Sequence, residues 1–351
     1  MNNRFLIYKI ILITILIINI DNKDINKSNN NRIQFEKGKT YFLFCMGLIG
    51  SGKSSFFKEV YSFLNTKEKK EKFNTFLFPS DIIKTEVVEK LKNFPNFNLE
   101  ELHNIISEIA DIELYKQIDK CLNNLDKNKI NILLIDENIP NGIDIFVEKY
   151  LINKTIQNFV VIVPNITRPI IIDDLKYPWS MNYFIQCYFR LKNRKDHTLL
   201  NGDNPLSTII YLRYLKRSEN FDFYRDIKKK IDIKPFRQEY LKDKKLKNIK
   251  KLFQKFKQEN NEKNIFIQKI DLTDESKIIK IGSDTKYFFK NVVTKLSDKM
   301  TGKVVKEKYG KEINQYFGLL EKKYKKNDFN NCSNIVREEI KDLFENGINE
   351  S

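Results

Sequence analysis

The sequence contains few of the residues that build metal centres and disulfide frameworks. Its 351 residues include two histidines and four cysteines, and no two cysteines have the C-x-x-C spacing of a zinc or redox motif. This composition argues against a zinc site and against a disulfide-stapled fold. The thiols are expected to be buried and free, at Cys45, Cys121, Cys187 and Cys332. The chain also contains no internal repeat.

Acidic residues are in the minority among the charged ones. The chain has 46 Asp and Glu against 63 Lys and Arg, which gives a formal net charge of +17. Such an excess favours a polyanionic partner, with nucleic acid as the first hypothesis and an acidic membrane surface as the second. An alternative interpretation is a compositional bias of the whole proteome, because Lys, Asn and Ile are abundant throughout.

The beginning of the chain is the one long apolar run. Residues 5–20 are almost wholly apolar, although Lys9 interrupts them. Because a spanning helix needs about 20 apolar residues, we interpret residues 1–20 as a signal-like or short anchor segment. Membrane contact and targeting to the secretory route or to an organelle would follow, and without such targeting the chain would stay in the cytoplasm or nucleus. Residues 21–38 are predicted to form a polar linker.

A glycine-rich motif follows this linker. Residues 46–56 read MGLIGSGKSSF, in which Gly47 to Ser54 match the pattern G-x-x-x-x-G-K-S. An apolar run at residues 40–45 precedes the motif, and apolar side chains at helical spacing follow it. Strand, glycine loop and helix form the context of a phosphate-binding loop, the alternative being a chance cluster of glycines in a turn. We predict that a nucleoside triphosphate, ATP or GTP, is bound by Gly47, Gly50, Ser51, Gly52, Lys53, Ser54 and Ser55.

Within this motif, two side chains have distinct predicted roles. Lys53 would reach the β- and γ-phosphates, and Ser54 would hold Mg²⁺.

Three further apolar runs are predicted to be strands. They cover residues 73–78, 130–135 and 159–164, with helical patterns between them. One of these helices is predicted to begin near Leu99, with Asn98 and Glu101 at capping-box spacing. Its predicted buried face carries Leu102, Ile105, Ile106, Ile109, Ile118, Cys121, Leu122 and Leu125. Alternating strands and helices predict an α/β fold, a P-loop NTPase-like parallel sheet flanked by helices.

Two carboxylates follow predicted strands of this sheet. Ligands of parallel sheets bind beyond the carboxyl ends of the strands, so Asp81 and Asp136 should lie beside the glycine motif. Asp81 is predicted to be the base that accepts a proton from an attacking hydroxyl, the alternative being the N-cap of the next helix. Asp136 is predicted to hold Mg²⁺. The adjacent Glu137 leaves open a second interpretation, in which it activates water in an NTPase.

The pattern after residue 178 is helical, and we interpret it as a helical lid followed by a helical C-terminal extension. Ser180 is a candidate N-cap for a helix that would carry Arg190 and Arg194 on one face. These arginines could clamp the transferred phosphoryl group or the acceptor, although a single arginine is more often a surface residue. Residues 225–260 are strongly basic and are predicted to form an amphipathic helix that contacts RNA or is merely solvated.

Several short elements, taken in order, resemble the central 5′-kinase domain of plant and fungal tRNA ligases. The plant form is the most similar. After the glycine motif, that family has elements like G-D-L-I-K, D-K-N-x-P-N, V-P, a proline–aromatic–Ser helix start and F-R-V-L-Q-R-x-N-H. The matching elements here are SDIIK at 80–84, DENIPN at 136–141, VP at 163–164, YPWS at 177–180 and FRLKNRKDH at 189–197. The agreement in order and approximate spacing spans residues 40–236.

This resemblance implies a domain that moves the γ-phosphate of ATP or GTP to the 5′-OH of an RNA end, with a tRNA half as the expected RNA. It assigns transfer to Asp81, Lys53, Arg190 and Arg194, and Mg²⁺ to Ser54 and Asp136. The sequence departs from the family at two positions. Glu137 stands where the family has a basic residue, and Asp196 stands where the family has Asn before the histidine. Motifs of the family's ligase and phosphodiesterase domains are absent, so those steps would need separate chains.

The predicted organisation therefore has four parts. They are a signal-like segment at 1–20, a linker at 21–38, a P-loop kinase domain at 39–236 and a basic helical extension at 237–351. Two other functions stay open at this point. One is a P-loop kinase of a small metabolite, and the other is a catalytically inactive adaptor that binds RNA in a nucleotide-dependent manner.

Overall fold

The computed structural model describes residues 33–91, 99–139, 150, 158–195, 200, 202, 204–222, 226, 264–270, 272, 279–297, 299–324 and 333–345. The apolar run 5–20 and the basic stretch 225–260, apart from residue 226, lie outside them. The chain divides into two compact units, residues 1–33 and residues 34–351, and the fold below is that of the second.

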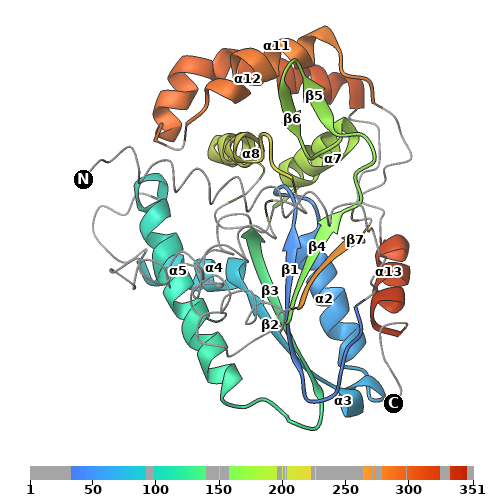
Figure 1. Cartoon of the computed structure of the whole chain (residues 1–351). Helices are drawn as coiled ribbons and strands as arrows, with labels where there is room; N and C mark the ends of the chain where they lie inside the picture. The colour runs from blue at the N-terminus through green and yellow to red at the C-terminus, as the bar shows by residue number, and fades with distance from the viewer. Residues whose placement is uncertain are drawn as a thin grey trace, which may run out of the picture. The chain divides into compact units, whose positions relative to one another are not determined.

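A five-stranded sheet with only parallel pairs forms the centre of this unit (Figure 1). The strand order is β2-β3-β1-β4-β7, and the strands are β1 (Thr40–Met46), β2 (Phe73–Pro79), β3 (Ile130–Ile139), β4 (Asn158–Pro164) and β7 (Asn264–Ile270). Leu43 in β1 lies opposite Leu134 on one side and Val160 on the other. The four strands predicted from apolar runs are confirmed, and so is an α/β fold with a parallel sheet flanked by helices.

Helices cover both faces of the sheet because the central strands are apolar on both faces (Figure 1). One face packs against α4 (Ser80–Leu91) and α5 (Leu99–Leu122), which share a core with Phe44, Leu133 and Val161. The other face carries α2 (Lys53–Leu64), with the short α3 (Lys69–Lys72) after it and α13 (Ser333–Glu345) against α2.

The start of the described chain belongs to this core. Phe35 is buried, and its ring stacks on Phe344 of α13 with centroids 5.0 Å apart. The prediction that a polar linker extends to residue 38 is therefore wrong at this point. The Phe35 ring also meets Tyr41 and Phe73 edge-on, so this aromatic residue joins a cluster that includes a helix about 300 residues later in the chain.

The buried face of α5 differs from the predicted one. Residues at intervals of four are buried, namely Ile106, Ala110, Leu114 and Ile118, whereas Ile105 and Ile109 are exposed. The prediction is confirmed at Ile106, Ile118 and Cys121, which are buried. It was wrong at Ile105 and Ile109, because isoleucines occur on more than one face of this helix and their spacing alone does not select the face that meets the sheet. The predicted capping pair at Asn98 and Glu101 lies outside the described side chains.

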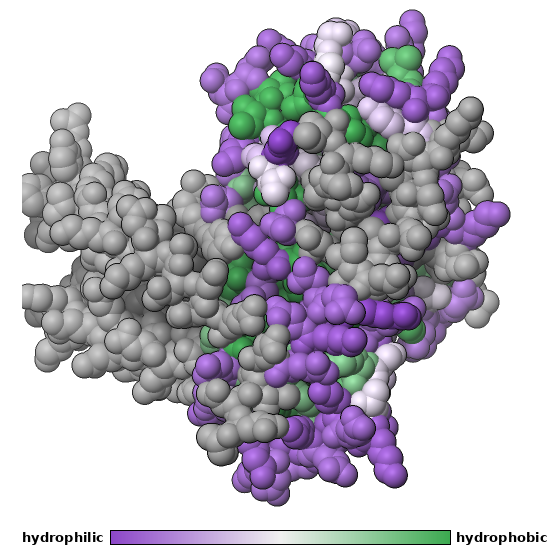
Figure 2. All heavy atoms as spheres, turned by 90° about the vertical axis from the view of Figure 1, so that its right-hand side faces the viewer, coloured by the Kyte–Doolittle hydropathy of each residue, from purple (hydrophilic) through white to green (hydrophobic). Residues whose placement is uncertain are grey.

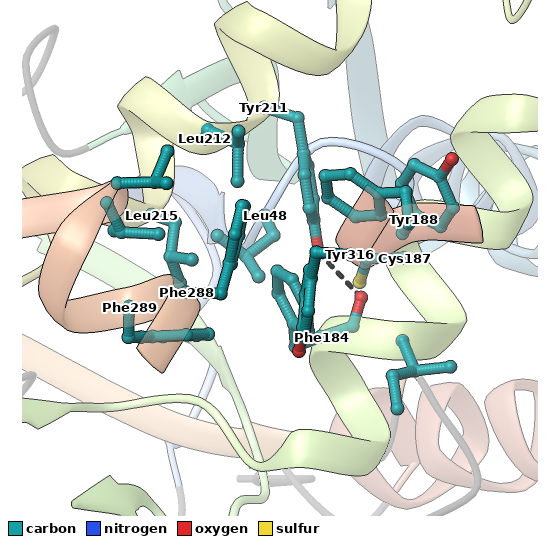
Figure 3. Packing of buried hydrophobic residues seen from close by; sticks show 14 of the residues in the cluster. Leu48, Phe184, Cys187, Tyr188, Tyr211, Leu212, Leu215, Phe288, Phe289 and Tyr316 are labelled. Atoms are coloured by element: carbon teal, nitrogen blue, oxygen red, sulfur yellow. Dashed lines mark hydrogen bonds between the residues drawn. The ribbon is translucent and has the colours of Figure 1, made fainter. Parts of the chain in front are cut away.

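A second layer of helices lies beyond the carboxyl ends of the strands (Figure 1). It consists of the hairpin β5 (Ile170–Ile172) and β6 (Leu175–Tyr177), α7 (Met181–Lys192), α8 (Pro205–Arg217), α11 (Ser283–Asn291), the 3₁₀ turn η2 (Val293–Lys295) and α12 (Gly302–Tyr324). These elements share one aromatic core. In Figure 3, Phe184, Tyr211 and Phe288 converge there, and the Tyr211 hydroxyl donates a hydrogen bond to the Phe184 carbonyl at 2.6 Å.

The predicted C-terminal extension is part of both layers. Residues 264–270 pair with β4 as the last strand of the sheet, and α11 and α12 pack on α7 and α8. The prediction that residues 237–351 form a helical extension is confirmed for α11, α12 and α13. It is wrong for residues 264–270, which form a strand of the sheet, and these elements pack into the two layers instead of forming a separate part. The strand signal was weak because β7 is at the edge of the sheet, where polar residues such as Gln268 and Lys269 are tolerated.

On the face shown in Figure 2, hydrophilic side chains make up most of the described surface, and hydrophobic ones emerge in smaller groups. None of the helices in the described part of the chain combines the length and apolar composition needed to cross a bilayer.

Candidate functional site

A loop of residues 47–52, called the glycine loop below, connects β1 to α2 at the carboxyl end of β1. Gly50 and Gly52 have φ values of +82° and +92°, which glycine adopts without strain. Their conformation lets the loop curve tightly before α2 begins at Lys53. The first backbone N–H groups of a helix have no partner within the helix and carry partial positive charge, so this end of α2 attracts anions.

The Lys53 side chain folds back onto the glycine loop. Its ammonium donates hydrogen bonds to the carbonyls of Gly47 (3.2 Å) and Leu48 (2.9 Å) and to Ser51 Oγ (3.4 Å). Burial lowers the pKa of Lys53, and the nearby Asp136 carboxylate partly opposes this shift. A buried ammonium that is held by backbone carbonyls can exchange them for stronger anionic partners.

Asp136 lies in β3, directly across from Pro79 of β2. Its side chain is buried and accepts a hydrogen bond from the Ser54 hydroxyl in the first turn of α2. Burial and, after it, the neighbouring Asp81 raise the pKa of Asp136 to about 6. The strand continues to Ile139, so Asp136 lies within β3 instead of just after it. The side chain of Glu137 lies outside the described part of the structure.

Asp81 lies in the first turn of α4, which begins at Ser80 directly after β2. It is thus inside the helix, and the alternative role as N-cap residue is not supported. Its Oδ2 accepts a hydrogen bond from Arg194 Nη2 at 3.4 Å, and both side chains are about one-third exposed. The Ser80 hydroxyl donates to the backbone carbonyl of Asp136 at 2.6 Å, which fixes the start of α4 against β3.

The two arginines reach different parts of this edge. Arg190 is in the last turn of α7, and its Nη1 donates to the carbonyls of Ser51 (3.4 Å) and Leu272 (3.2 Å). Arg194 follows the end of α7 at Lys192 and pairs with Asp81. The expectation that both lie on one helix face is wrong, because the helix ends between them. The predicted cap is confirmed, since Ser180 Oγ accepts from the Tyr183 N–H at 2.9 Å.

The glycine loop is also packed against α7, which the sequence did not indicate. A Cβ atom at Gly47 would lie 2.5 Å from the Tyr183 hydroxyl oxygen, and one at Gly50 would overlap the backbone carbonyl of Cys187. Tyr183 and Cys187 occur in an apolar helical stretch, where an aromatic residue or a thiol is predicted to be core. No spacing rule within α7 relates these residues to a loop more than 130 positions earlier.

The structure therefore brings Lys53, Ser54, Asp136, Asp81 and Arg194 together at the carboxyl edge of the sheet, and it directs Arg190 to the backbone around the glycine loop. His197 lies outside the described residues. Within the described residues, no group of three or more His, Cys, Asp or Glu side chains is arranged to hold a metal ion. The ammonium and the guanidinium can bind a phosphate-rich ligand. Of the two carboxylates, Asp136 lies beside the Ser54 hydroxyl, and Asp81 is placed to accept a proton.

No protein-family model matches this chain, and no curated protein matches it.

Proposed function

We propose that this protein is an RNA 5′-hydroxyl kinase, which transfers the γ-phosphate of ATP or GTP to a 5′-OH RNA end. The observation that carries the proposal is the convergence of Lys53, Ser54 and Asp136 with the Asp81–Arg194 ion pair at one edge of the sheet. Each of these groups matches a step of phosphoryl transfer. Because little covalent chemistry is left to the protein in such a reaction, position and charge account for most of the catalysis.

The glycine loop is the proposed site of the nucleotide phosphates. Backbone N–H groups at its end and at the start of α2 would donate to phosphate oxygens, and Ser55 lies in the same first turn. Lys53 would leave the carbonyls of Gly47 and Leu48 and bind the β- and γ-phosphates instead. An ammonium exchanges neutral acceptors for charged ones in this movement, which favours the bound state.

Ser54 and Asp136 have the chemistry of a Mg²⁺ site. Mg²⁺ prefers oxygen ligands and is commonly held by one or two protein groups together with substrate phosphates. The hydroxyl and the buried carboxylate already contact each other, and burial, followed by the neighbouring Asp81, keeps the pKa of Asp136 raised. When bound, Mg²⁺ would neutralise charge on the phosphate oxygens.

Asp81 is the proposed base. The acceptor hydroxyl would place its proton on the Asp81 carboxylate as its oxygen forms a bond to the γ-phosphorus. The bond between that phosphorus and the bridging oxygen of the nucleotide would break, and its electron pair would leave with the nucleoside diphosphate. Arg194 would stay close to the transferring group, because its partner Asp81 lies beside the acceptor.

RNA is the proposed acceptor because of the family resemblance. The elements at residues 80–84, 136–141 and 189–197 are similar to those of the kinase domain of plant and fungal tRNA ligases, and the layer that contains α7 and α8 would act as the lid. A tRNA half is the expected substrate, and separate ligase and cyclic phosphodiesterase chains would complete the repair. The excess of basic residues is consistent with a polyanionic acceptor.

The test is a phosphate-transfer assay with the full chain, γ-labelled ATP or GTP, and three acceptors. We expect label on 5′-OH RNA, with less on 5′-OH DNA and little on a nucleoside. Labelling of the nucleoside alone would instead indicate a kinase of small metabolites. Nucleotide-dependent RNA binding without any labelling would indicate an inactive adaptor.

A further inference from the structure

One face of α7 follows the glycine loop for its whole length. Tyr183, Cys187 and Arg190 are spaced at i, i+4 and i+7, so they lie along one side of the helix. Tyr183 lies against Gly47, the Cys187 backbone against Gly50, and Arg190 donates to the Ser51 carbonyl. Leu48 and Ile49 of the loop belong to the same apolar core as α7. The loop is therefore supported from outside by a helix that is distant in the sequence.

Tyr183 is the polar contact at the first half of the loop. Its ring is fully buried and stacks on Trp179, with centroids 5.3 Å apart and an interplanar angle of 10°. Trp179 is itself anchored by a hydrogen bond from Nε1 to Ser218 Oγ at 2.7 Å. The Tyr183 hydroxyl lies close to Ser51 and Leu48 and is buried there without a hydrogen-bond partner among the described residues. Burial holds the pKa of Tyr183 well above its ordinary value, so the hydroxyl keeps its proton.

The same segment of the loop also holds Lys53. The Lys53 ammonium donates to Gly47, Leu48 and Ser51, so these acceptors lose a donor when Lys53 turns to a phosphate. A loop segment that loses its internal donor can relax into another shape unless a second group keeps it in place. The Tyr183 hydroxyl is rigidly placed at this point and does not move with Lys53.

We propose that Tyr183 is a positioning residue for nucleotide binding, whose hydroxyl keeps residues 47–51 in their phosphate-binding curvature when Lys53 leaves them. The proposal rests on the nucleotide binding proposed above. It differs from simple core packing in one respect: the hydroxyl, and not the ring, is the group that acts on the nucleotide. Tyr183→Phe separates the two, because it keeps the stacked ring and removes one oxygen.

Tyr211→Phe is the matched control. Tyr211 is also fully buried in the same core, and its hydroxyl donates to the Phe184 carbonyl at 2.6 Å. Figure 3 shows this hydroxyl directed at α7 from α8. Loss of that hydrogen bond should lower the melting temperature without a change in nucleotide affinity.

The experiment measures the dissociation constant for ATP and GTP by calorimetry and the melting temperature of full-length wild type and both variants. For Tyr183→Phe we expect a dissociation constant about five- to tenfold higher, which is the effect of the one hydrogen bond that the Tyr183 hydroxyl would donate to a loop acceptor freed by Lys53. The KM for the nucleotide should rise equally, and the KM for the acceptor should not change. In Tyr211→Phe the affinity should equal that of wild type.

Two results would overturn the proposal. One is a wild-type nucleotide affinity in Tyr183→Phe. The other is that Tyr211→Phe loses as much nucleotide affinity as Tyr183→Phe when both variants have lost the same amount of melting temperature. If Tyr183→Phe does not fold, Ser51→Ala removes the facing hydroxyl, and unchanged affinity in that variant counts against the proposal. If wild type binds no nucleotide, the proposed function fails, and this inference fails with it.

Discussion

Asp136 and Asp81 lie at the same edge of the sheet, but their surroundings differ. Asp136 belongs to a buried half of the candidate site, which also contains Lys53 and Ser54. Asp81 belongs to an open half, where it pairs with Arg194 and both side chains are about one-third exposed. The buried half is built on β1, β3 and α2, whereas the open half joins α4 to the end of α7. One edge of a sheet can therefore hold a buried carboxylate beside a partly solvated carboxylate that is paired with an arginine.

The open half should show the largest single effect. Asp81→Asn keeps size and polarity but cannot accept the hydroxyl proton, so phosphate transfer should fall by about 10³-fold while nucleotide binding is retained. Calorimetry beside an RNA phosphorylation assay measures both quantities.

Asp173→Asn is the control for this variant, because Asp173 is an exposed carboxylate that pairs with Lys290 on the hairpin side. Transfer at the wild-type rate in Asp81→Asn would remove Asp81 as the base and make Asp136 the next residue to test.

In the buried half, Lys53→Ala should lower phosphate transfer by a factor on the order of 10², because charge stabilisation of the transferring group is lost. The fold should be intact, since Lys53 contacts the loop only through neutral acceptors. Circular dichroism and the transfer assay check this together. Lys58→Ala on the exposed face of α2 is the matched control. Near-normal turnover in Lys53→Ala would contradict the assignment of the glycine loop to phosphate.

The pH dependence of stability should separate the two carboxylates. Because its pKa is raised to about 6 from the ordinary 3.8, Asp136 binds its proton more tightly in the folded than in the unfolded state. Its contribution to stability is then fully present below about pH 4 and is lost as the pH rises through about 6. The difference amounts to about 3 kcal/mol at most. Urea unfolding between these pH values should show this loss in wild type, and Asp136→Asn should lack it.

The same titration gives a ligand prediction. Mg²⁺ needs the charged carboxylate, so Mg²⁺-dependent nucleotide binding should weaken as the pH falls below about 6. An affinity that is constant across this pH range would argue that Asp136 does not hold the metal.

The smallest effect is expected for the stability of the exposed pair. Arg194→Ala should change the free energy of unfolding by less than about 1 kcal/mol, because the Asp81–Arg194 pair is partly solvated. Arg190→Ala should destabilise more, since Arg190 donates to two backbone carbonyls. Urea unfolding of both variants compares them. A larger loss in Arg194→Ala would mean that the open half is as tightly built as the buried one.

Much of the sheet was predictable from local pattern. The runs that became β1 to β4 are almost continuously apolar, and a buried parallel strand needs such a run because both of its faces are covered. The strand β7 was missed because it lies at the edge of the sheet, where only one side pairs with a neighbouring strand. Such an edge tolerates polar residues, here Gln268 and Lys269. The face of α5 was predicted correctly at Ile106 and Ile118 but not at Ile105 and Ile109, because its isoleucines fit more than one buried face.

The candidate site was predictable to a similar extent. Lys53, Ser54, Asp81 and Asp136 were identified because each follows a strand or a glycine turn, and the carboxyl ends of parallel strands must meet at one edge. The pairing of Arg194 with Asp81 and the turn of Arg190 towards the backbone depend on where α7 ends, which helix pattern alone leaves uncertain by a residue or two.

The sequence by itself determined the α/β class, the parallel strands and the glycine turn, because burial and backbone freedom act on neighbouring residues. The tertiary structure alone decided that α7 supports the glycine loop at Gly47 and Gly50, that Asp136 is buried while Asp81 is open, and that residues 264–270 complete the sheet. These outcomes depend on contacts between segments that are far apart in the sequence. Such contacts are selected by packing across the whole core and not by any local preference of the chain.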